Sequence, residues 1–168
     1  MSRQYINDKY CVRCGRKDPC PYLRKNLGTL MPINTKKPCV IDIGCGNGRN
    51  SKFMIKNNCS VIPLDMVNDY GIKTVLGKQN LPVKPNYADI ILCNYLMMFL
   101  NKKERKMVIK EIKRVSKKGC KIMLELYPAK DSETKNEKEM LELQQELFTM
   151  LGWKKIKYSK GRFIAEKA

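Results

Sequence analysis

The sequence predicts an α/β protein with a doubly wound, mainly parallel seven-stranded sheet that ends in an antiparallel hairpin. Two observations lead to this prediction. Short apolar runs recur along the chain, and stretches with helical spacing lie in the longer gaps between them. Helices that alternate with apolar strands cover both faces of a parallel sheet, whereas two strands joined by a tight turn pair as a hairpin.

The strands follow a basic, cysteine-bearing N-terminal segment, residues 1–30, which we interpret as an appendage to a domain spanning residues 31–168. The first strand, Cys39 to Ile43, is short, β-branched and apolar, as expected of a parallel strand buried on both faces. Only about six residues separate the second and third strands, too few for a crossover helix, so this edge of the sheet should be abbreviated. The strand candidates are 39–43, 60–65, 72–76, 87–93, 120–126, 153–158 and 162–166.

Helical stretches fill the longer gaps, and one of them has clear terminal signals. Asn101 can cap its N-terminus, and Glu104 stands at the spacing of a capping box. Val108 and Ile112 recur at helical spacing beyond it, and we expect Gly119 to end the helix. The helix candidates are a segment that begins near 48–50, a segment at 102–116 and a segment at 135–151.

Composition sets the class of protein. The 168 residues suffice for one domain with a real core. The chain has 34 Lys and Arg against 16 Asp and Glu, a net charge of +18, and such a field attracts polyanions. We therefore expect nucleic acid as a partner; a lysine-rich composition that only aids solubility is the alternative.

Two features that the sequence lacks exclude further classes of protein. The chain has no histidine, which rules out histidine general bases, Ser-His-Asp sites and H-E-x-x-H zinc hydrolases. No apolar run reaches the roughly 18 residues that a membrane span needs, and residues 1–30 lack a signal-peptide core. We expect a cytoplasmic protein without a membrane partner, whose cysteines are reduced.

The most informative segment runs from Val40 to Asn50 and combines a strand, a glycine turn and a helix start. Asp42 is followed by Gly44, Gly46 and Gly48 at alternate positions, in the pattern D-x-G-x-G-x-G. Glycine has no Cβ, so the backbone can approach a ligand closely. The pattern is neither the G-x-G-x-x-G of dinucleotide folds nor a P-loop, which ends in lysine. We expect a ligand here; a glycine-rich turn without one is the alternative.

Asp65 ends the second candidate strand. In an open α/β sheet the ligand lies beyond the carboxyl ends of the strands, where the strand order reverses. A carboxylate at that place can accept hydrogen bonds from both hydroxyls of a ribose. We therefore predict that Asp65 binds the ribose of a nucleoside cofactor, with a plain strand-end turn residue as the alternative.

Several segments resemble class I S-adenosylmethionine-dependent methyltransferases. The first is the glycine turn; the second is Leu81-Pro82 followed by Tyr87, Asp89 and a hydrophobic run, which resembles the L-P…(F/Y)-D-(hydrophobic)₄ pattern of that family. More narrowly, G-C-G-N-G-R-N-S at 44–51 and L-M-M-F-L at 96–100 resemble the tellurite-resistance branch. The resemblance covers about residues 38–168. It implies a Rossmann-like fold and S-adenosyl-L-methionine as the cofactor.

The resemblance also implies a set of cofactor contacts. Many family members place an acidic residue shortly before the L-P pair to meet the adenine amine, whereas this chain has Lys78, Gln79 and Asn80. Adenine would then rely on amide or backbone partners. The implied cofactor-binding residues are Asp42, Gly44, Cys45, Gly46, Asn47, Gly48, Asn50, Asp65, Met66, Asn80, Leu81, Cys93 and Asn94.

The residues after the fourth strand are the candidates for chemistry. Methyl transfer is an in-line displacement that depends mainly on positioning, and it needs a base only if the acceptor must lose a proton. Asn94 and Tyr95 are the nearest catalytic candidates. Methyltransferases of exocyclic base amines usually carry (D/N/S)-P-P-(Y/F) here; this chain lacks both prolines, which disfavours amino methylation of DNA bases. We expect Cys93 to be a small buried residue rather than a nucleophile.

Three N-terminal cysteines, Cys11, Cys14 and Cys20, include one knuckle of zinc-ribbon spacing. A structural zinc ion needs four ligands, and only Cys39 is near enough in sequence to be the fourth. An unmetallated basic segment that covers the acceptor is the default interpretation. Zinc is the alternative, and would favour a nucleic-acid clamp.

Together these features predict an S-adenosylmethionine-dependent methyltransferase that acts on a nucleic acid or a nucleic-acid component. One alternative keeps the enzyme but takes a small-molecule acceptor, as the tellurite-resistance resemblance implies. The other is a cofactor-binding or nucleic-acid-binding module that transfers nothing.

Overall fold

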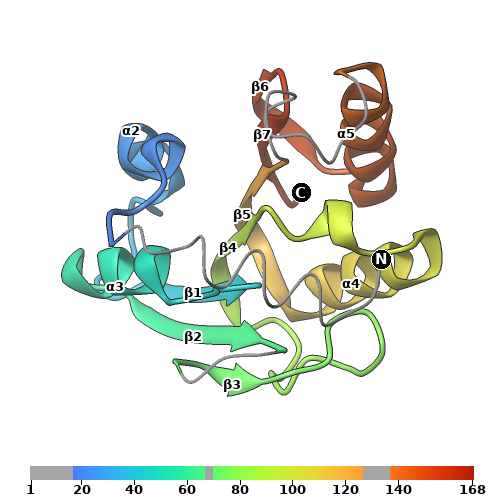
Figure 1. Ribbon diagram of the computed structural model, residues 1–168. Coiled ribbons are helices and arrows are strands. Elements are labelled where there is room, and N and C mark those ends of the chain that lie inside the picture. The colour runs from blue at the N-terminus through green and yellow to red at the C-terminus, as the bar shows by residue number, and fades with distance from the viewer. Residues whose placement is uncertain (1–16, 67–69, 127–136) are drawn as a thin grey trace.

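A computed structural model describes residues 17–66, 70–126 and 137–168, which form a seven-stranded sheet in the order β3-β2-β1-β4-β5-β7-β6 (Figure 1). The first five strands are parallel, and β7 runs antiparallel to both β5 and β6. The predicted fold class, with its C-terminal hairpin, is confirmed. The strands are β1 (Cys39–Ile43), β2 (Ser60–Asp65), β3 (Ile72–Lys73), β4 (Ala88–Asn94), β5 (Ser116–Glu125), β6 (Lys154–Ser159) and β7 (Arg162–Glu166).

Helices cover both faces of the sheet. Buried residues of α4 and α5 pack with Ile41 and Ile91 on one face, and buried residues of α2 and α3 pack with Val40 and Ile90 on the other. Successive side chains of a strand point to opposite faces, so the alternation within β1 and β4 divides the core in two. The helices are α2 (Pro21–Leu30), α3 (Arg49–Lys56), α4 (Lys102–Val115) and α5 (Glu137–Leu151), with a 3₁₀ turn η2 (Met97–Phe99). None of the helices in the described ranges is long and apolar enough to cross a bilayer.

The start of α4 is as predicted, but its end is not. Asn101 accepts a hydrogen bond from the Glu104 backbone, and the Glu104 carboxylate accepts one from the Asn101 backbone, which completes the capping box. The helix stops at Val115, and β5 begins at once with Ser116, which pairs with Ala88. The prediction that Gly119 ends the helix is therefore wrong.

Gly119 instead lies inside β5, at an irregularity of the sheet. The register with β4 shifts between Ala88 and Ile90, and Gly119 has a φ of 76°, a value that favours glycine. A glycine in a basic stretch can mark either a helix end or a strand bulge. Here the pairing of β5 with β4 places Gly119 in a strand.

Helix α2 was not predicted. It lies within the N-terminal segment interpreted as an appendage, yet Leu23 and Leu30 are fully buried in the same cluster as Val40 and Ile90. Pro21 at the first turn and Cys20 at the N-cap begin the helix, because proline fits a position whose backbone donor is not needed. Residues 17–30 thus share the core of the rest of the chain, and a boundary at residue 30 remains a prediction from sequence.

We expect Leu23→Ala to lower the free energy of unfolding by about 2–5 kcal/mol, because it leaves a cavity between α2 and the sheet. Urea denaturation measures this. Leu141→Ala, on the exposed side of α5, is the matched control and should change stability by less than about 0.5 kcal/mol. An equally small effect at both positions would contradict the docking of α2.

Candidate functional site

The candidate site lies at the carboxyl edge of the parallel strands. Strand β1 pairs with β2 on one side and β4 on the other, so the strand order reverses at β1. Gly44 follows β1, whereas Asp65, Asn94 and Glu125 are the last residues of β2, β4 and β5. The edge at such a reversal is where open α/β sheets bind ligands.

The glycine turn adopts a backbone that only glycine accepts readily. Gly44, Gly46 and Gly48 have φ values of 76°, 54° and 73°. A Cβ at Gly46 would meet no atom within 4 Å, so the space beside this backbone is open to a ligand. A Cβ at Gly48 would come within 2.1 Å of the Tyr70 ring, so this glycine is required for packing. The turn therefore fits the close approach of a cofactor.

Asp65 is joined to this turn. The Gly46 N–H donates a hydrogen bond of 2.9 Å to Oδ2 of Asp65. The predicted ribose carboxylate and the predicted cofactor-binding turn thus lie side by side, although 19 residues separate them in sequence. The half-buried carboxylate meets the requirement for binding ribose hydroxyls next to the glycine turn.

Asp42 is buried beneath the turn, with 1% of its surface exposed. The Ser51 hydroxyl donates a hydrogen bond of 2.6 Å to its Oδ2, which ties α3 to β1. Burial raises the pKa of Asp42 to about 6, the Ser51 hydrogen bond opposes the rise, and the nearby charge of Asp65 adds to it. The carboxylate thus both holds the motif together and places a negative charge under the cofactor turn.

The other residues predicted in the motif take different positions. Cys45 is buried, Asn47 is exposed and Met66 is half-buried. Asn50 is buried and accepts a 2.9 Å hydrogen bond from the Cys20 backbone, which links the motif to the start of α2. Its amide oxygen therefore contacts the N-terminal segment.

The segment predicted to meet adenine is fixed from α4. Glu111 Oε2 accepts a 2.8 Å hydrogen bond from the Leu81 N–H, and Arg114 donates to the Leu81 carbonyl. The hydrogen bond from Arg114 lowers the pKa of Glu111, so the pair is charged. Since both backbone groups of Leu81 have protein partners, an adenine contact here would fall to the exposed Asn80.

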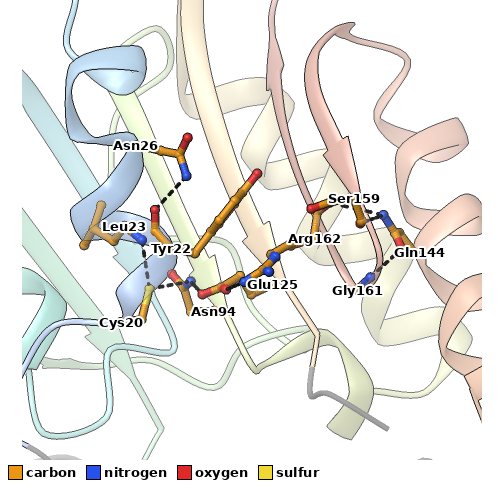
Figure 2. A network of polar contacts seen from close by, with 10 residues as sticks. All are labelled: Cys20, Tyr22, Leu23, Asn26, Asn94, Glu125, Gln144, Ser159, Gly161 and Arg162. Atoms are coloured by element: carbon orange, nitrogen blue, oxygen red, sulfur yellow. Dashed lines mark hydrogen bonds and ion pairs between the residues drawn. The ribbon is translucent and has the colours of Figure 1, made fainter.

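The end of β4 carries a buried polar cluster (Figure 2). Asn94 Nδ2 donates a 2.7 Å hydrogen bond to Oε2 of Glu125, its register partner on β5, and lies 3.6 Å from Cys20 Sγ. Asn94 Oδ1 is buried without a hydrogen-bond partner. Arg162 Nη1 lies 3.7 Å from Oε1 of Glu125, and its guanidinium lies over the Tyr22 ring. The cluster thus joins α2, β4, β5 and β7.

Tyr95, the second catalytic candidate, has a φ of 59°, and its N–H donates to the Glu125 carbonyl at 2.8 Å. Burial and then the negative charge of Glu125 raise the pKa of Tyr95. Its phenol therefore stays protonated at neutral pH and cannot take up a proton. Sequence reasoning missed Glu125, although the rule that selected Asp65, an acidic residue at a strand end, could have found it.

The cysteines take structural positions. Cys93 is fully buried, and burial raises its pKa to about 12, which agrees with the expectation of a packed thiol. Cys20 caps α2, since its Sγ accepts a hydrogen bond from the Leu23 N–H. Cys11 and Cys14 lie outside the described residues, and within the described ranges no three potential ligands gather. The zinc hypothesis thus stays a prediction.

Comparison with protein families identifies the class of enzyme. The family model for a methyltransferase domain matches residues 41–124, half of the 168-residue chain, from β1 to β5. The chain belongs to this family. It is an S-adenosylmethionine-dependent methyltransferase, and the predicted enzyme class and cofactor are confirmed. A comparison with curated proteins finds no match.

Solved structures share the fold of this methyltransferase at low sequence identity. An S-adenosylmethionine-dependent methyltransferase from Aquifex aeolicus has a TM-score of 0.68 at 15% identity, covering 94% of this chain and 98% of its own. One from Archaeoglobus fulgidus has a TM-score of 0.67 at 14% identity, covering 99% and 100%. The 1,6-didemethyltoxoflavin-N1-methyltransferase of Burkholderia thailandensis, solved with 1,6-didemethyltoxoflavin and S-adenosylhomocysteine, has a TM-score of 0.68 at 12% identity, covering 98% and 84%.

The raised pKa of Asp42 predicts a pH dependence of stability. The pKa of Asp42 is near 4 in the unfolded state and near 6 in the folded state. At pH values between the two, the folded protein holds a proton that the unfolded protein has lost, so the free energy of unfolding falls as pH rises. Asp42→Asn removes this titration. We expect the variant to gain about 2 kcal/mol relative to the wild type between pH 4 and pH 7, as measured by urea unfolding. A pH-independent difference would contradict the buried carboxylate.

Proposed function

We propose that this methyltransferase methylates a nucleic acid or a nucleic-acid component such as a nucleotide. The observation that supports this best is a pair of arginines at the carboxyl edge. Arg49 begins α3 directly after the glycine turn, and its positive charge acts on both Asp42 and Tyr95. Arg162 borders Glu125 with 46% of its side chain exposed. Guanidinium groups bind phosphate well.

The rest of the chain adds to this attraction. The net charge of +18 favours encounter with anionic molecules. The two arginines can then hold a phosphate beside the reacting group rather than elsewhere on the surface. The net positive charge and the two arginines together favour an anionic acceptor.

The roles within the site follow from the geometry. S-adenosylmethionine, when bound, supplies an electrophilic methyl group. Asp65 and the Gly46 backbone would hold its ribose and methionine parts, since they lie together at the edge. Asn94 ends β4, the strand between β1 and β5, and Tyr95 follows it, so both lie between the glycine turn and Glu125. This order supports an acceptor on the β5 side.

A small molecule unrelated to nucleic acid is the second candidate acceptor. Asn94 and Glu125 are 7% and 4% exposed beneath α2, so only a small or extended group reaches them. The Burkholderia thailandensis enzyme is named for methylating N1 of 1,6-didemethyltoxoflavin. A tellurite-type oxyanion acceptor, implied by the resemblance to the tellurite-resistance branch, belongs to the same class of candidates.

The test is transfer of a labelled methyl group to separate pools of DNA, tRNA, rRNA, nucleotides, tellurite and small thiols. We expect label in a nucleic-acid or nucleotide pool, with polymer binding that weakens steeply as salt rises. Asp65→Ala should lower S-adenosylhomocysteine affinity by about tenfold or more, because a charged hydrogen-bond partner is lost, and should abolish transfer.

The matched control is Asp18→Ala, which removes a carboxylate from an exposed position. It should leave both the affinity and the transfer unchanged. Label confined to tellurite or thiols would overturn the nucleic-acid proposal while leaving the methyltransferase intact. An unchanged affinity in Asp65→Ala would contradict the cofactor site.

A further inference from the structure

The buried amide oxygen of Asn94 has no partner, and it belongs to the residue that ends β4. Leaving a buried acceptor unpaired costs about 1–3 kcal/mol, so such an atom in a binding site indicates a missing donor. The amide orientation is fixed by its neighbour. If Asn94 were flipped, its oxygen would face the Glu125 carboxylate at 2.7 Å, acceptor against acceptor.

Glu125 adds a second set of acceptor atoms at the same place. Its Oε2 accepts from Asn94, whereas Oε1 has Arg162 at 3.7 Å, which is too long for a hydrogen bond. A carboxylate has about four lone-pair sites, and the Cys20 thiol and the Tyr95 phenol share those of Glu125 with Asn94, so a further donor must compete with them for a place. The pair therefore presents an amide oxygen and a carboxylate, while the Nδ2 donor of Asn94 is already committed to Glu125.

We infer that Asn94 and Glu125 form an acceptor-binding pair that selects a nitrogen bearing hydrogen, and that Glu125 takes up the proton released on methylation. This inference rests on the proposed function. Two hydrogen-bond acceptors side by side match an amino, amidine or ring N–H group. They repel an oxyanion or a thiolate, which offers only acceptor atoms.

The transfer step then balances. The lone pair of the acceptor nitrogen bonds to the methyl carbon as the carbon–sulfur bond of the sulfonium breaks, and the sulfur keeps that bonding pair. The nitrogen, now positively charged, gives its proton to Glu125, which becomes a neutral acid and later releases the proton to solvent. The products are S-adenosylhomocysteine, the methylated amine and one proton.

The Asn94–Glu125 pair is held by contacts between strands rather than by residues directly after β4. Asn94 comes from β4, but the second acceptor comes from β5 through the register pair Asn94 and Glu125. Gln144 from α5 accepts from the Gly161 N–H and donates to the Ser159 carbonyl, which fixes the hairpin that carries Arg162 (Figure 2). The pair is thus held by two strands and a clamped turn, rather than by a local motif.

The test uses side-chain amide NMR of the full chain loaded with S-adenosylhomocysteine. Acetamidinium carries only N–H donors, and acetate has the same shape but carries only acceptors. We expect acetamidinium to shift the Asn94 side-chain amide signal in a saturable way, and acetate to leave it in place. Tetramethylammonium, a cation without N–H groups, should also leave it in place. No response to acetamidinium, or an equal response to all three, would overturn the inference.

Two variants test whether Glu125 is responsible. Glu125→Gln keeps the size and an oxygen for Asn94 but turns one acceptor into a donor, so acetamidinium should bind about tenfold more weakly or worse. Glu142→Gln, which removes the same charge from an exposed site on α5, should bind it like the wild type. Equal affinity in Glu125→Gln and Glu142→Gln would contradict the role of Glu125.

Binding of S-adenosylhomocysteine distinguishes failure of the proposed function from failure of the inference about nitrogen. Both variants should bind S-adenosylhomocysteine as the wild type does, since neither residue belongs to the cofactor turn. If the wild type fails to bind it, the proposed function fails, and the acetamidinium titration of the unloaded chain still tests the pair. If the wild type binds it and acetamidinium has no effect, only the inference about nitrogen fails.

Discussion

The central constraint of this structure is that β1 pairs in parallel with β2 on one side and β4 on the other. Parallel neighbours end at the same edge of a sheet, so the residues that follow β1, β2 and β4 are brought together whatever their distance in sequence. The connections to those neighbours leave on opposite faces, as the two core clusters show. The backbone between them is left open, and the glycine turn occupies that place.

Hydrogen bonds to acidic side chains hold the residues at this edge of the sheet in place. Asp42 is held by Ser51 and Asp65 by Gly46, each through a hydrogen bond that spans two motif segments. On the other side of β4, Glu125 is held by Asn94 and bordered by Arg162. Buried charges are costly unless they are paired, so each carboxylate fixes the elements that supply its partners. The same contacts that stabilise the fold thereby position the two halves of the site.

Local signals in the sequence were sufficient for most of the sheet. The apolar run Cys39–Ile43 and the capping box at Asn101 depend on residues close in sequence, so both could be read directly. The end of α4 could not, because pairing of Ser116 with Ala88 outweighs the helix signal that continues to Gly119. Helix α2 was missed because its burial depends on a sheet face formed by residues after position 38.

The candidate site likewise has one part that the sequence predicts and one part that depends on tertiary structure. Asp42, the glycines and Asp65 carry a recognisable pattern, and the structure brings them together. Glu125 could have been selected as an acidic strand-end residue, but its contact with Asn94, 31 residues away, follows only from the register of β4 and β5. The contacts of Asn50 with Cys20 likewise depend on where α2 docks. The sequence pattern locates the proposed cofactor residues, whereas tertiary pairing brings together the residues of the proposed acceptor pair.

A crystal structure of the chain with S-adenosylhomocysteine tests the central claim most directly, namely that the edge between β1 and β4 binds the cofactor. We expect both ribose hydroxyls to contact Asp65 and the ligand's amino acid part to lie along the turn at Gly44 and Gly46. The sulfur should face Asn94 and the side of β5. A ligand bound elsewhere, or one whose ribose makes no contact with Asp65, would contradict the account.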